Sequence, residues 1–389
     1  MTSADDGTVA KDDEILIPAD ALIEGKADAE PDVRSVVHDR QRLHQSMIRR
    51  LNRRARIKGE VVYPCLPALR DEIVRRLQSV FAALGKPLDA KEVQKLRGLL
   101  GQQLEKGYVR SGLSVVKLTW WSDAAKDMLL HYRIQIIERR KSGQYEMWVK
   151  NRTPPLFGAH PDARVMDVAA TLPKGARIVD LGAGTGRNAI PLAEAGCRVD
   201  TVDATTSFID IIRKTAAEKG VSERIEAKLG DILTEQETLP TDAYHMVLLS
   251  EVVPDLRRLV DLRQIFQRAD RLLVPGGYLL FNAFVTEPDF HPDPLTLELS
   301  QYNWCWLLTR ADLQKSAAEL SFELESDLEA YPYEKSRQPS WPPTGWYDNW
   351  SHGNDLFGLP KGECGPVSLR WLSYRKRAAT VPASEAAER

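Results

Sequence analysis

The stretch Ala176-Arg177-Ile178-Val179-Asp180-Leu181-Gly182-Ala183-Gly184-Thr185-Gly186-Arg187-Asn188 determines the fold expected for most of this chain. An apolar run is interrupted by Asp180 and leads into three glycines at alternate positions, which an apolar helical pattern follows from Ala189 to Gly196. A strand, a glycine turn and a helix in this order are typical of nucleotide-binding sites. Glycine lets the backbone approach a ligand closely, and the helix N-terminus offers free N–H groups.

Downstream of the turn, strand-like and helix-like segments alternate, as expected for an α/β domain with a parallel sheet. Four further strands are predicted at 199–203, 225–229, 244–249 and 278–284. Asp203 ends the first of these, about 20 residues beyond the turn, where a carboxylate is suited to the hydroxyls of a ribose. Asp231 follows the second and is suited to accept from the exocyclic amine of adenine. The sequence therefore predicts a site for a nucleoside-containing cofactor.

The motifs Asp180-x-Gly182-x-Gly184-x-Gly186, Asp203, Gly230-Asp231 and Leu273-Val274-Pro275-Gly276-Gly277 resemble, in this order, those of the class I S-adenosylmethionine (SAM)-dependent methyltransferases. The resemblance covers about 160–375 and implies a Rossmann-like α/β fold with a seven-stranded sheet whose last strand is antiparallel. The segments 322–328 and 367–374 are candidates for the final two strands. SAM is then the implied cofactor, and its predicted ligands are Asp180, Gly182, Ala183, Gly184, Gly186, Asn188, Asp203, Ala204, Asp231, Ile232 and Ser250.

Within the class, Gly186-Arg187-Asn188 before an apolar helix is similar to the tellurite-resistance (TehB-like) subgroup of small-molecule methyltransferases. The chain departs from that subgroup through its long N-terminal region and an aromatic insert. A nicotinamide dehydrogenase is the main alternative for a glycine turn. Two features argue against it: the glycines run GxGxG rather than GxGxxG, and Asp180 would repel a pyrophosphate, whereas it can receive the amino-acid end of SAM.

Methyl transfer is an in-line displacement, so the enzyme mainly aligns the reactants and excludes water. A general base is needed only for a protonated acceptor. Loops at the carboxyl ends of strands should supply these groups. Glu251 is predicted as base or acceptor-positioning group and His291 as a second candidate base, against the simpler interpretations of a helix-start carboxylate and an exposed loop histidine. The predicted substrate-binding residues are Asp255, Trp304, Trp346, Tyr347 and Trp350.

An insert rich in Pro, Gly and aromatic residues spans 331–365, between the last two predicted strands. Its rings are suited to a lid over a cationic or flat substrate. They are equally suited to a small core of their own beneath a long loop, and both interpretations stay open.

The region upstream is expected to hold an acidic flexible tail (1–35) and an α+β accessory domain (36–155), followed by the methyltransferase domain (156–380) and a second tail (381–389). In the accessory domain, helices precede an antiparallel meander of strands at 113–120, 131–137 and 145–149, with Ser142-Gly143 as a turn. The accessory domain contains no catalytic group that the sequence identifies. We expect it to cover the active site, bind a separate group or form a homodimer.

A basic segment at 42–58 lies within a helix predicted from 36 to 58 and contains Arg49, Arg50, Arg53, Arg54, Arg56 and Lys58. One interpretation is a surface for RNA or an anionic substrate. The alternative, a solvated helix whose Ile48, Leu51 and Ala55 pack inward, is favoured because no aromatic residue interleaves with the charges.

The bulk composition of 389 residues, with 43% hydrophobic and 28% charged residues, fits a globular protein of two or three domains. A net charge of −2 argues against binding nucleic acid by bulk charge. Four scattered cysteines without a CxxC pair argue against a disulfide framework or a metal site. Since the chain has neither a long apolar run nor secretory-signal features, we expect a cytoplasmic protein without membrane partners.

The sequence thus predicts a SAM-dependent methyltransferase acting on an N, O or S atom of a small molecule or natural-product intermediate. One alternative is an RNA or protein methyltransferase that uses the basic segment 42–58. The fourth strand ends in Ser-Glu-Val-Val-Pro rather than in the (Asn/Asp)-Pro-Pro-aromatic signature of many base and glutamine amide methylators, which argues against it. A SAM-binding regulator without turnover is the other alternative.

Overall fold

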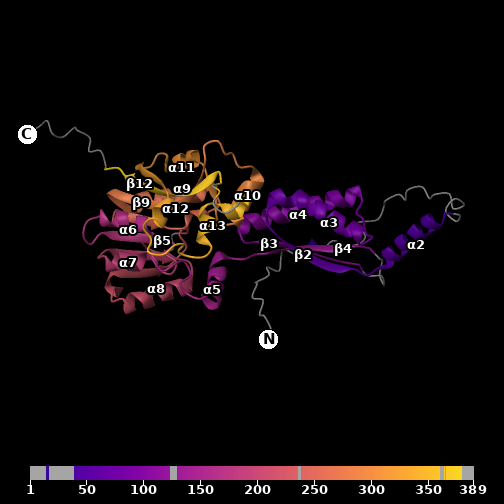
Figure 1. Ribbon diagram of the computed structural model, residues 1–389, viewed down its shortest axis with the longest axis horizontal. Helices are drawn as coiled ribbons and strands as arrows, with labels where there is room; N and C mark the ends of the chain where they lie inside the picture. Colours follow the sequence, from indigo (N-terminus) through magenta and orange to yellow (C-terminus); the bar gives the residue numbers. More distant parts are fainter. Residues whose placement is uncertain are drawn as a thin grey trace, which may run out of the picture. The chain divides into compact units, whose positions relative to one another are not determined.

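The computed structural model describes residues 15–16, 39–122, 129–234, 238–359, 363 and 365–378. The chain divides into two compact units, Met1–Arg140 and Lys141–Arg389 (Figure 1). The expected tails at 1–35 and 381–389 lie outside the described residues, apart from 15–16. Within the described part, no helix combines the length and apolarity that crossing a membrane requires.

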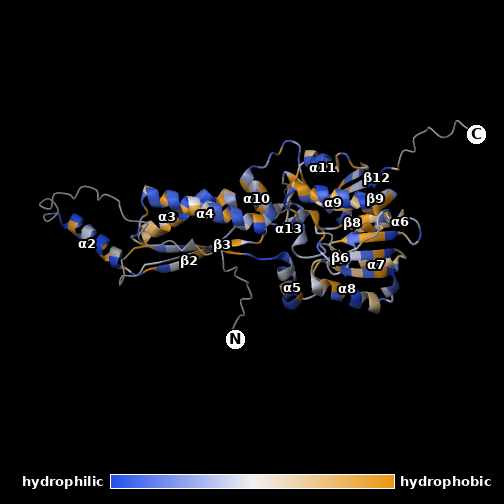
Figure 2. Cartoon of the chain, turned by 180° about the vertical axis from the view of Figure 1, so that it is seen from behind, coloured by the Kyte–Doolittle hydropathy of each residue, from blue (hydrophilic) through white to orange (hydrophobic). Residues whose placement is uncertain are grey.

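The first unit contains a four-stranded antiparallel sheet in the order β1-β4-β3-β2, covered by two helices. Its strands are β1 (Ile15–Leu16), β2 (Lys58–Pro64), β3 (Val115–Trp121) and β4 (His131–Ile137). Its helices are α2 (Arg40–Arg54), the 3-10 turn Pro67–Leu69, α3 (Arg70–Ala83) and α4 (Ala90–Arg110). In Figure 2, α3 and α4 alternate between hydrophilic and hydrophobic residues, because one side of each helix is buried on the sheet.

Two sequence predictions for the end of this region are wrong. The segment 145–149 is not a strand, and Ser142-Gly143 is not a hairpin turn, since both lie within helix α5 (Lys141–Asn151). The third long strand of the sheet is instead β2, which precedes α3 and α4 in the chain. The boundary between the units falls after Arg140 rather than near 155, because α5 groups with the second unit.

The second unit is built on a sheet in the order β11-β12-β9-β8-β5-β6-β7. β12 is antiparallel to both β9 and β11, and the remaining neighbours are parallel. This confirms the Rossmann-like α/β fold with one antiparallel final strand; a short β10 (Leu307–Leu308) also pairs with β9. The strands are β5 (Arg177–Leu181), β6 (Arg198–Asp203), β7 (Ile225–Leu229), β8 (Tyr244–Leu249), β9 (Leu273–Thr286), β11 (Phe322–Glu329) and β12 (Val367–Lys376).

Helices cover both faces of this sheet (Figure 1). Successive strand residues point to opposite faces: Ile178 packs in a core with α6 and α7, and Val179 packs in a second core with α9 and α11. The helices of this unit, with 3-10 turns at Ser222–Arg224 and Val253–Asp255, are α5, α6 (Ala163–Ala170), α7 (Ala189–Glu194), α8 (Thr206–Glu218), α9 (Leu259–Leu272), α10 (Pro294–Tyr302), α11 (Arg310–Ala317), α12 (Ala330–Lys335), α13 (Tyr347–Ser351) and α14 (Asn354–Phe357).

The aromatic rings of the insert pack into the core of the domain rather than into a small core of their own. Tyr347 and Trp350 are 3% and 8% exposed and belong to the same buried cluster as α6 and α7. Trp341 and Trp346 pack against that cluster and against these two rings. The rings therefore stabilise the insert as part of the domain.

Candidate active site

The loop after β5 approaches its neighbours so closely that its glycines are structurally required. Gly182, Gly184 and Gly186 have φ angles of +83°, +54° and +83°, which L side chains rarely adopt. A Cβ added to Gly182 would lie 2.5 Å from Cγ2 of Val252, in the loop after β8. A Cβ added to Gly184 would lie 3.4 Å from the ring of Phe157. The backbone of the loop is therefore confined between the segment after β8 and the segment before α6.

Two carboxylates stand at the carboxyl ends of β5 and β6. Asp203 accepts hydrogen bonds from the Gly184 N–H (2.9 Å) and the Thr205 N–H (2.8 Å), so it ties the glycine loop to the end of β6. Each of its oxygens keeps a lone pair for a ligand hydroxyl. Asp180 is 2% exposed. Burial raises its pKa to about 7, the Asp162 and Asp203 charges add to the shift, and Arg187 opposes it.

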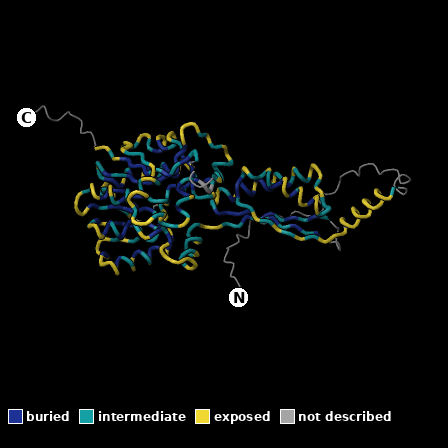
Figure 3. Tube along the Cα trace, in the orientation of Figure 1, coloured by how far each residue is buried: buried dark blue, intermediate teal, exposed yellow. Residues whose placement is uncertain are grey.

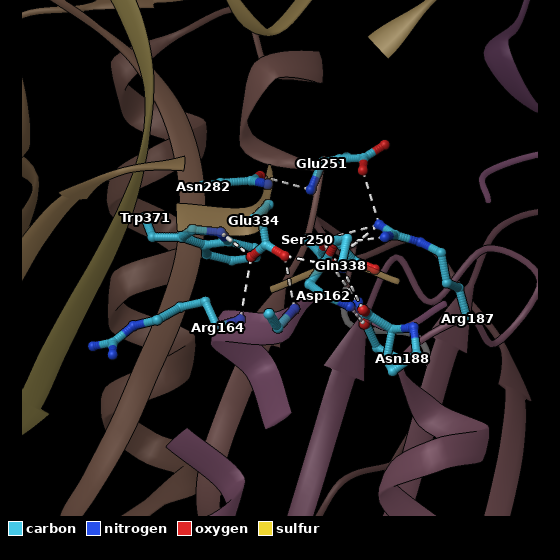
Figure 4. Close-up of polar contacts among 12 residues, drawn as sticks. Asp162, Arg164, Arg187, Asn188, Ser250, Glu251, Asn282, Glu334, Gln338 and Trp371 are labelled. Atoms are coloured by element: carbon cyan, nitrogen blue, oxygen red, sulfur yellow. Dashed lines mark hydrogen bonds and ion pairs between the residues drawn. The ribbon is translucent and has the colours of Figure 1, made fainter. Parts of the chain in front are cut away.

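Arg187 links three loops through a buried polar network (Figure 4). Its guanidinium donates to both oxygens of Asp162 (2.5 and 3.1 Å) and to Oε1 of Glu251 (2.8 Å). Asp162 also accepts from the Ser250 hydroxyl (2.5 Å) and from Nδ2 of Asn188 (2.9 Å). Burial disfavours the Arg187 charge, but Asp162 and Glu251 outweigh burial and hold the pKa of Arg187 above its usual value.

This network brings together three predicted site residues, Asn188, Ser250 and Glu251, through two residues that were not predicted to be site residues. Arg187 lies within the glycine-rich stretch 176–188, and this position could have indicated a role in the site. Asp162 offered only the weak signal of an acidic residue just before a predicted helix, and its partner Asn188 lies 26 residues away along the chain.

Glu251 is held in an unusual backbone conformation directly after β8. Its φ is +59°, a left-handed value that is uncommon for a residue with a side chain. Its N–H donates to Oδ1 of Asn282 (2.7 Å), and Asn282 is fully buried on β9. The side chain is 14% exposed, and its second carboxylate oxygen points away from Arg187 in Figure 4. Burial raises the pKa of Glu251 to about 7; Arg187 opposes this, while Asp162, Asp255 and Glu334 add to it.

Glu334, on α12 of the insert, anchors that insert to the start of α6 (Figure 4). It accepts from the backbone N–H groups of Ala163 (2.7 Å) and Arg164 (3.2 Å). It also accepts from the Trp371 indole (2.8 Å) and the Gln338 amide (3.0 Å). Both carboxylate oxygens are thus satisfied by protein donors, and Glu334 is a structural residue.

Helix α5 is fixed to the loops after β6 and β8. Asp255 accepts from the Tyr145 hydroxyl (3.2 Å) and forms an ion pair with Lys141 (3.3 Å). Glu146 accepts from the Ser207 N–H (3.1 Å). Burial and the Asp255 charge hold the pKa of Tyr145 well above its usual value, so its hydroxyl remains a donor. α5 therefore lies across the strand ends where open α/β sheets bind ligands.

Aromatic rings from α5 and its neighbours pack against one another near the carboxyl ends of the strands. The Tyr145 ring contacts Phe208 and Trp304 with centroids 5.5 and 5.8 Å apart, and Trp148 stacks on Trp304 at 5.3 Å. Phe157 packs edge-on against both Tyr145 and Phe208. Of these rings, only Trp304 was predicted as a site residue. Its backbone φ is +59° and its carbonyl accepts from the Trp350 indole (2.9 Å).

The remaining predicted residues lie in varied surroundings. Ala183 is buried in the glycine loop, Ala204 and Asp231 are exposed, and Ile232 packs partly buried on the core. Burial and the Glu251 charge raise the pKa of Tyr347, so this insert residue lies near Glu251. His291 is exposed, and none of the described hydrogen bonds or ion pairs of the Arg187 network reaches it. The structure therefore offers no support for His291 as a base.

Residues 178–277 match the family model described as a methyltransferase domain. The ubiquinone biosynthesis O-methyltransferase of Chelativorans sp. (strain BNC1) is 27% identical over 173 residues, which are 44% of this chain and 59% of that protein. The tRNA 5-carboxymethoxyuridine methyltransferase of Escherichia coli (strain K12) is 34% identical over 110 residues, which are 28% and 40%. The chain spans about half the length of the curated relatives it matches.

Among solved structures, geranyl diphosphate C-methyltransferase from Streptomyces coelicolor A3(2) aligns with a TM-score of 0.45 and 14% identity. The alignment covers 60% of this chain and 98% of that one. Residues 178–277 therefore belong to a methyltransferase domain, and the order of the sheet and the glycine loop are those expected of a class I SAM-dependent methyltransferase.

The site is chemically suited to SAM, whose sulfonium and ammonium groups are cationic. Asp162 and Glu251 pair with the buried guanidinium of Arg187, whose charge also acts on Asp180, and Asp203 stands at the end of β6. Burial raises the pKa of Asp203 as well. A cationic ligand beside Asp180 and Asp203 would favour the ionised forms of these two carboxylates.

Proposed function

We propose that this protein is a SAM-dependent methyltransferase that methylates an N, O or S atom of a small molecule or natural-product intermediate, with Glu251 as base or acceptor-positioning group. The observation that carries the proposal is the placement of Glu251. Its carboxylate stands at the end of β8, is joined to the glycine loop through Arg187, and has a pKa of about 7.

When bound, SAM supplies a methyl group on a sulfonium that is already activated for transfer. In this proposal Asp180 receives the ammonium of its amino-acid end, and Asp203 accepts from the ribose hydroxyls. Tyr145 and Phe157 exclude water from the same edge of the sheet, which strengthens these electrostatic contacts.

Glu251 then takes the proton of a hydroxyl or amine acceptor during transfer. A base acts best with a pKa near the working pH, and the pKa of about 7 meets that condition. Arg187 stabilises the ionised carboxylate, while Asn282 holds the backbone that presents it. A thiolate acceptor would need only the positioning.

A small-molecule acceptor is supported by the similarity to the ubiquinone biosynthesis O-methyltransferase of Chelativorans sp.. The similarity to the tRNA 5-carboxymethoxyuridine methyltransferase of Escherichia coli favours tRNA as a second candidate acceptor. Incubation with labelled SAM and either a metabolite extract or total tRNA separates the two, because the label enters one fraction only.

The test of the mechanism compares Glu251→Gln with the unaltered protein. We expect methyl transfer to fall by roughly 100-fold or more, while affinity for S-adenosylhomocysteine stays within a few fold. Equal transfer by the variant would exclude Glu251 as a base. Failure of the unaltered protein to bind S-adenosylhomocysteine would exclude the cofactor, and binding without transfer to any acceptor would support a regulator instead.

A further inference from the structure

Helix α2 carries an apolar stripe that stays largely exposed in the described part of the chain. Leu43, Met47 and Leu51 recur every four residues and so lie on one side of the helix, and Ile48 widens that side. Their exposed fractions are 42%, 58%, 67% and 45%. This contradicts the expectation that Ile48 and Leu51 pack inward. Figure 3 shows α2 exposed along its length.

The remainder of α2 is strongly basic. Its sequence contains six arginines and one histidine and neither aspartate nor glutamate. At about 100° per residue, Arg42 and Arg49 lie opposite the apolar stripe and Arg50 borders it. Arg40 and Arg54 lie in line with the stripe at the two ends of the helix. Figure 2 shows hydrophilic and hydrophobic residues together on this helix. An acid-free helix with an apolar side and a cationic side has the composition of helices that lie in a membrane interface.

The helix is also held so that the stripe stays free. Its C-terminal end contacts the rest of the first unit where Asn52 lies against Gly85. At its start, the side chain of Asp39 accepts from the N–H groups of Gln41 and Arg42 and caps the helix. With 15 residues the helix is about 22 Å long, and the stripe from Leu43 to Leu51 covers about two and a half of its turns.

We propose that α2 docks this protein on an anionic lipid surface, with Leu43, Met47 and Leu51 inserted among the acyl chains and the arginines against the lipid phosphates. A helix in the plane of the headgroups is compatible with the absence of a spanning helix from the described residues. The arginines that border the stripe or lie at its ends can extend their charged ends toward the phosphates while their stems cover apolar surface.

Two other binding partners for the exposed surface of α2, RNA and a second copy of the helix, agree less well with its composition. RNA would neutralise the arginines through its phosphates, but it would leave the aliphatic stripe in water, and α2 has no aromatic residue for base stacking. A second copy of α2 would cover the stripe, but it would bring the arginines of both copies together without any carboxylate from either helix.

The experiment is co-sedimentation of the full chain with vesicles of equal parts phosphatidylcholine and phosphatidylglycerol, compared with phosphatidylcholine alone. We expect binding to the anionic vesicles only. Leu43→Gln/Met47→Gln/Leu51→Gln should weaken it by roughly tenfold or more. Arg42→Gln/Arg49→Gln should weaken it by roughly fivefold per arginine. Matched controls in the same unit, Val109→Gln (79% exposed) and Arg75→Gln (73% exposed side chain), should leave it unchanged.

Three results would overturn the proposal: no binding to anionic vesicles, equal binding to both vesicles, or binding that the apolar variant leaves intact. An RNA mobility shift that only the arginine variant abolishes would assign α2 to RNA. Self-association in sedimentation velocity that the apolar variant abolishes would assign it to a second copy. Because α2 contributes nothing to the Arg187 network, S-adenosylhomocysteine binding should be equal in all variants, and circular dichroism with thermal unfolding checks that the first unit, which contains α2, stays folded. If the triple variant fails to fold, the single variant Leu51→Gln replaces it in the co-sedimentation experiment and should also weaken binding to anionic vesicles.

Discussion

Gly182 and Gly184 occupy the same loop but need the absence of a side chain for different reasons. At Gly182 both the φ angle of +83° and the nearby Val252 side chain exclude a Cβ. At Gly184 the φ of +54° is a left-handed value that other residues reach at a cost of about 1–2 kcal/mol, and Phe157 is at ordinary contact distance.

We therefore predict that Gly182→Ala is much more harmful than Gly184→Ala. The first should lower the free energy of unfolding by roughly 3 kcal/mol or more, because backbone strain and overlap add together. The second should cost about 1 kcal/mol. Urea unfolding of both variants checks this, and equal losses would show that Val252 moves aside freely.

The raised pKa of Asp180 predicts a pH dependence of cofactor binding. Below pH of about 7 the free protein holds a proton on this carboxyl, whereas a bound ammonium favours the carboxylate. Binding must then release the proton, so the dissociation constant for SAM should rise by about tenfold per pH unit as pH falls below 7.

Calorimetric titration between pH 8 and 5.5 measures this slope. Asp180→Asn serves as the control. The variant should bind SAM more weakly than the unaltered protein at pH 8, and its dissociation constant should lack the change with pH that titration of Asp180 causes. A dissociation constant for the unaltered protein that does not change with pH would contradict the assignment of Asp180 to the ammonium.

At the scale of elements, Glu334 makes the buried hydrogen bonds between α12 and α6, beside an exposed bond from the Tyr333 hydroxyl to Asp167. Glu334 is 2% exposed and accepts from two backbone N–H groups at the start of α6 and from the Trp371 indole. Glu334→Ala should therefore lower the free energy of unfolding by roughly 2–4 kcal/mol, since several buried donors lose their acceptor. Glu323→Ala, at an exposed position of β11, is the matched control. Thermal unfolding of the second unit is the measurement, and equal melting of the two variants would contradict it.

The strands and the glycine loop were predictable because their signals are local. The central parallel strands β5, β8 and β9 contain largely apolar runs, and burial on both faces of the sheet requires such runs. Helix α5 was not predictable in this way. Tyr145, Met147 and Val149 favour a strand by propensity, but Tyr145 and Trp148 gain ring contacts with Phe208 and Trp304 only as a helix. Tertiary packing decides between the two.

Prediction of the site residues is limited in the same way. Asp203 was predictable from its spacing to the glycine turn. Asp162 and Asn282 were not, because each acts through a hydrogen bond to a residue that is distant in sequence, Asn188 and Glu251 respectively. α2 was predicted as a helix, but whether its apolar side is covered depends on tertiary structure.

For the whole molecule, the division after Arg140 makes a prediction about which part binds the cofactor. A chain that begins at Lys141 keeps α5 and its contacts with Ser207 and Asp255, and should bind S-adenosylhomocysteine as tightly as the full chain. A chain that begins at Gly158 lacks Tyr145 and Phe157 and should bind at least roughly tenfold more weakly. Isothermal titration compares the two, and equal affinity would show that α5 does not cover the cofactor.

The position of β12 between β9 and β11 bears on how the protein is made. Along the chain β12 follows both of its neighbours, yet it is the strand that joins them. During synthesis the N-terminal elements emerge first, so β9 and β11 leave the ribosome before the strand that completes their hydrogen bonding. Until β12 arrives, both present open edges that other chains can pair with. A nascent chain that stalls before Val367 should therefore depend on chaperones, whereas a chain released after Lys376 can pair β12 with both β9 and β11.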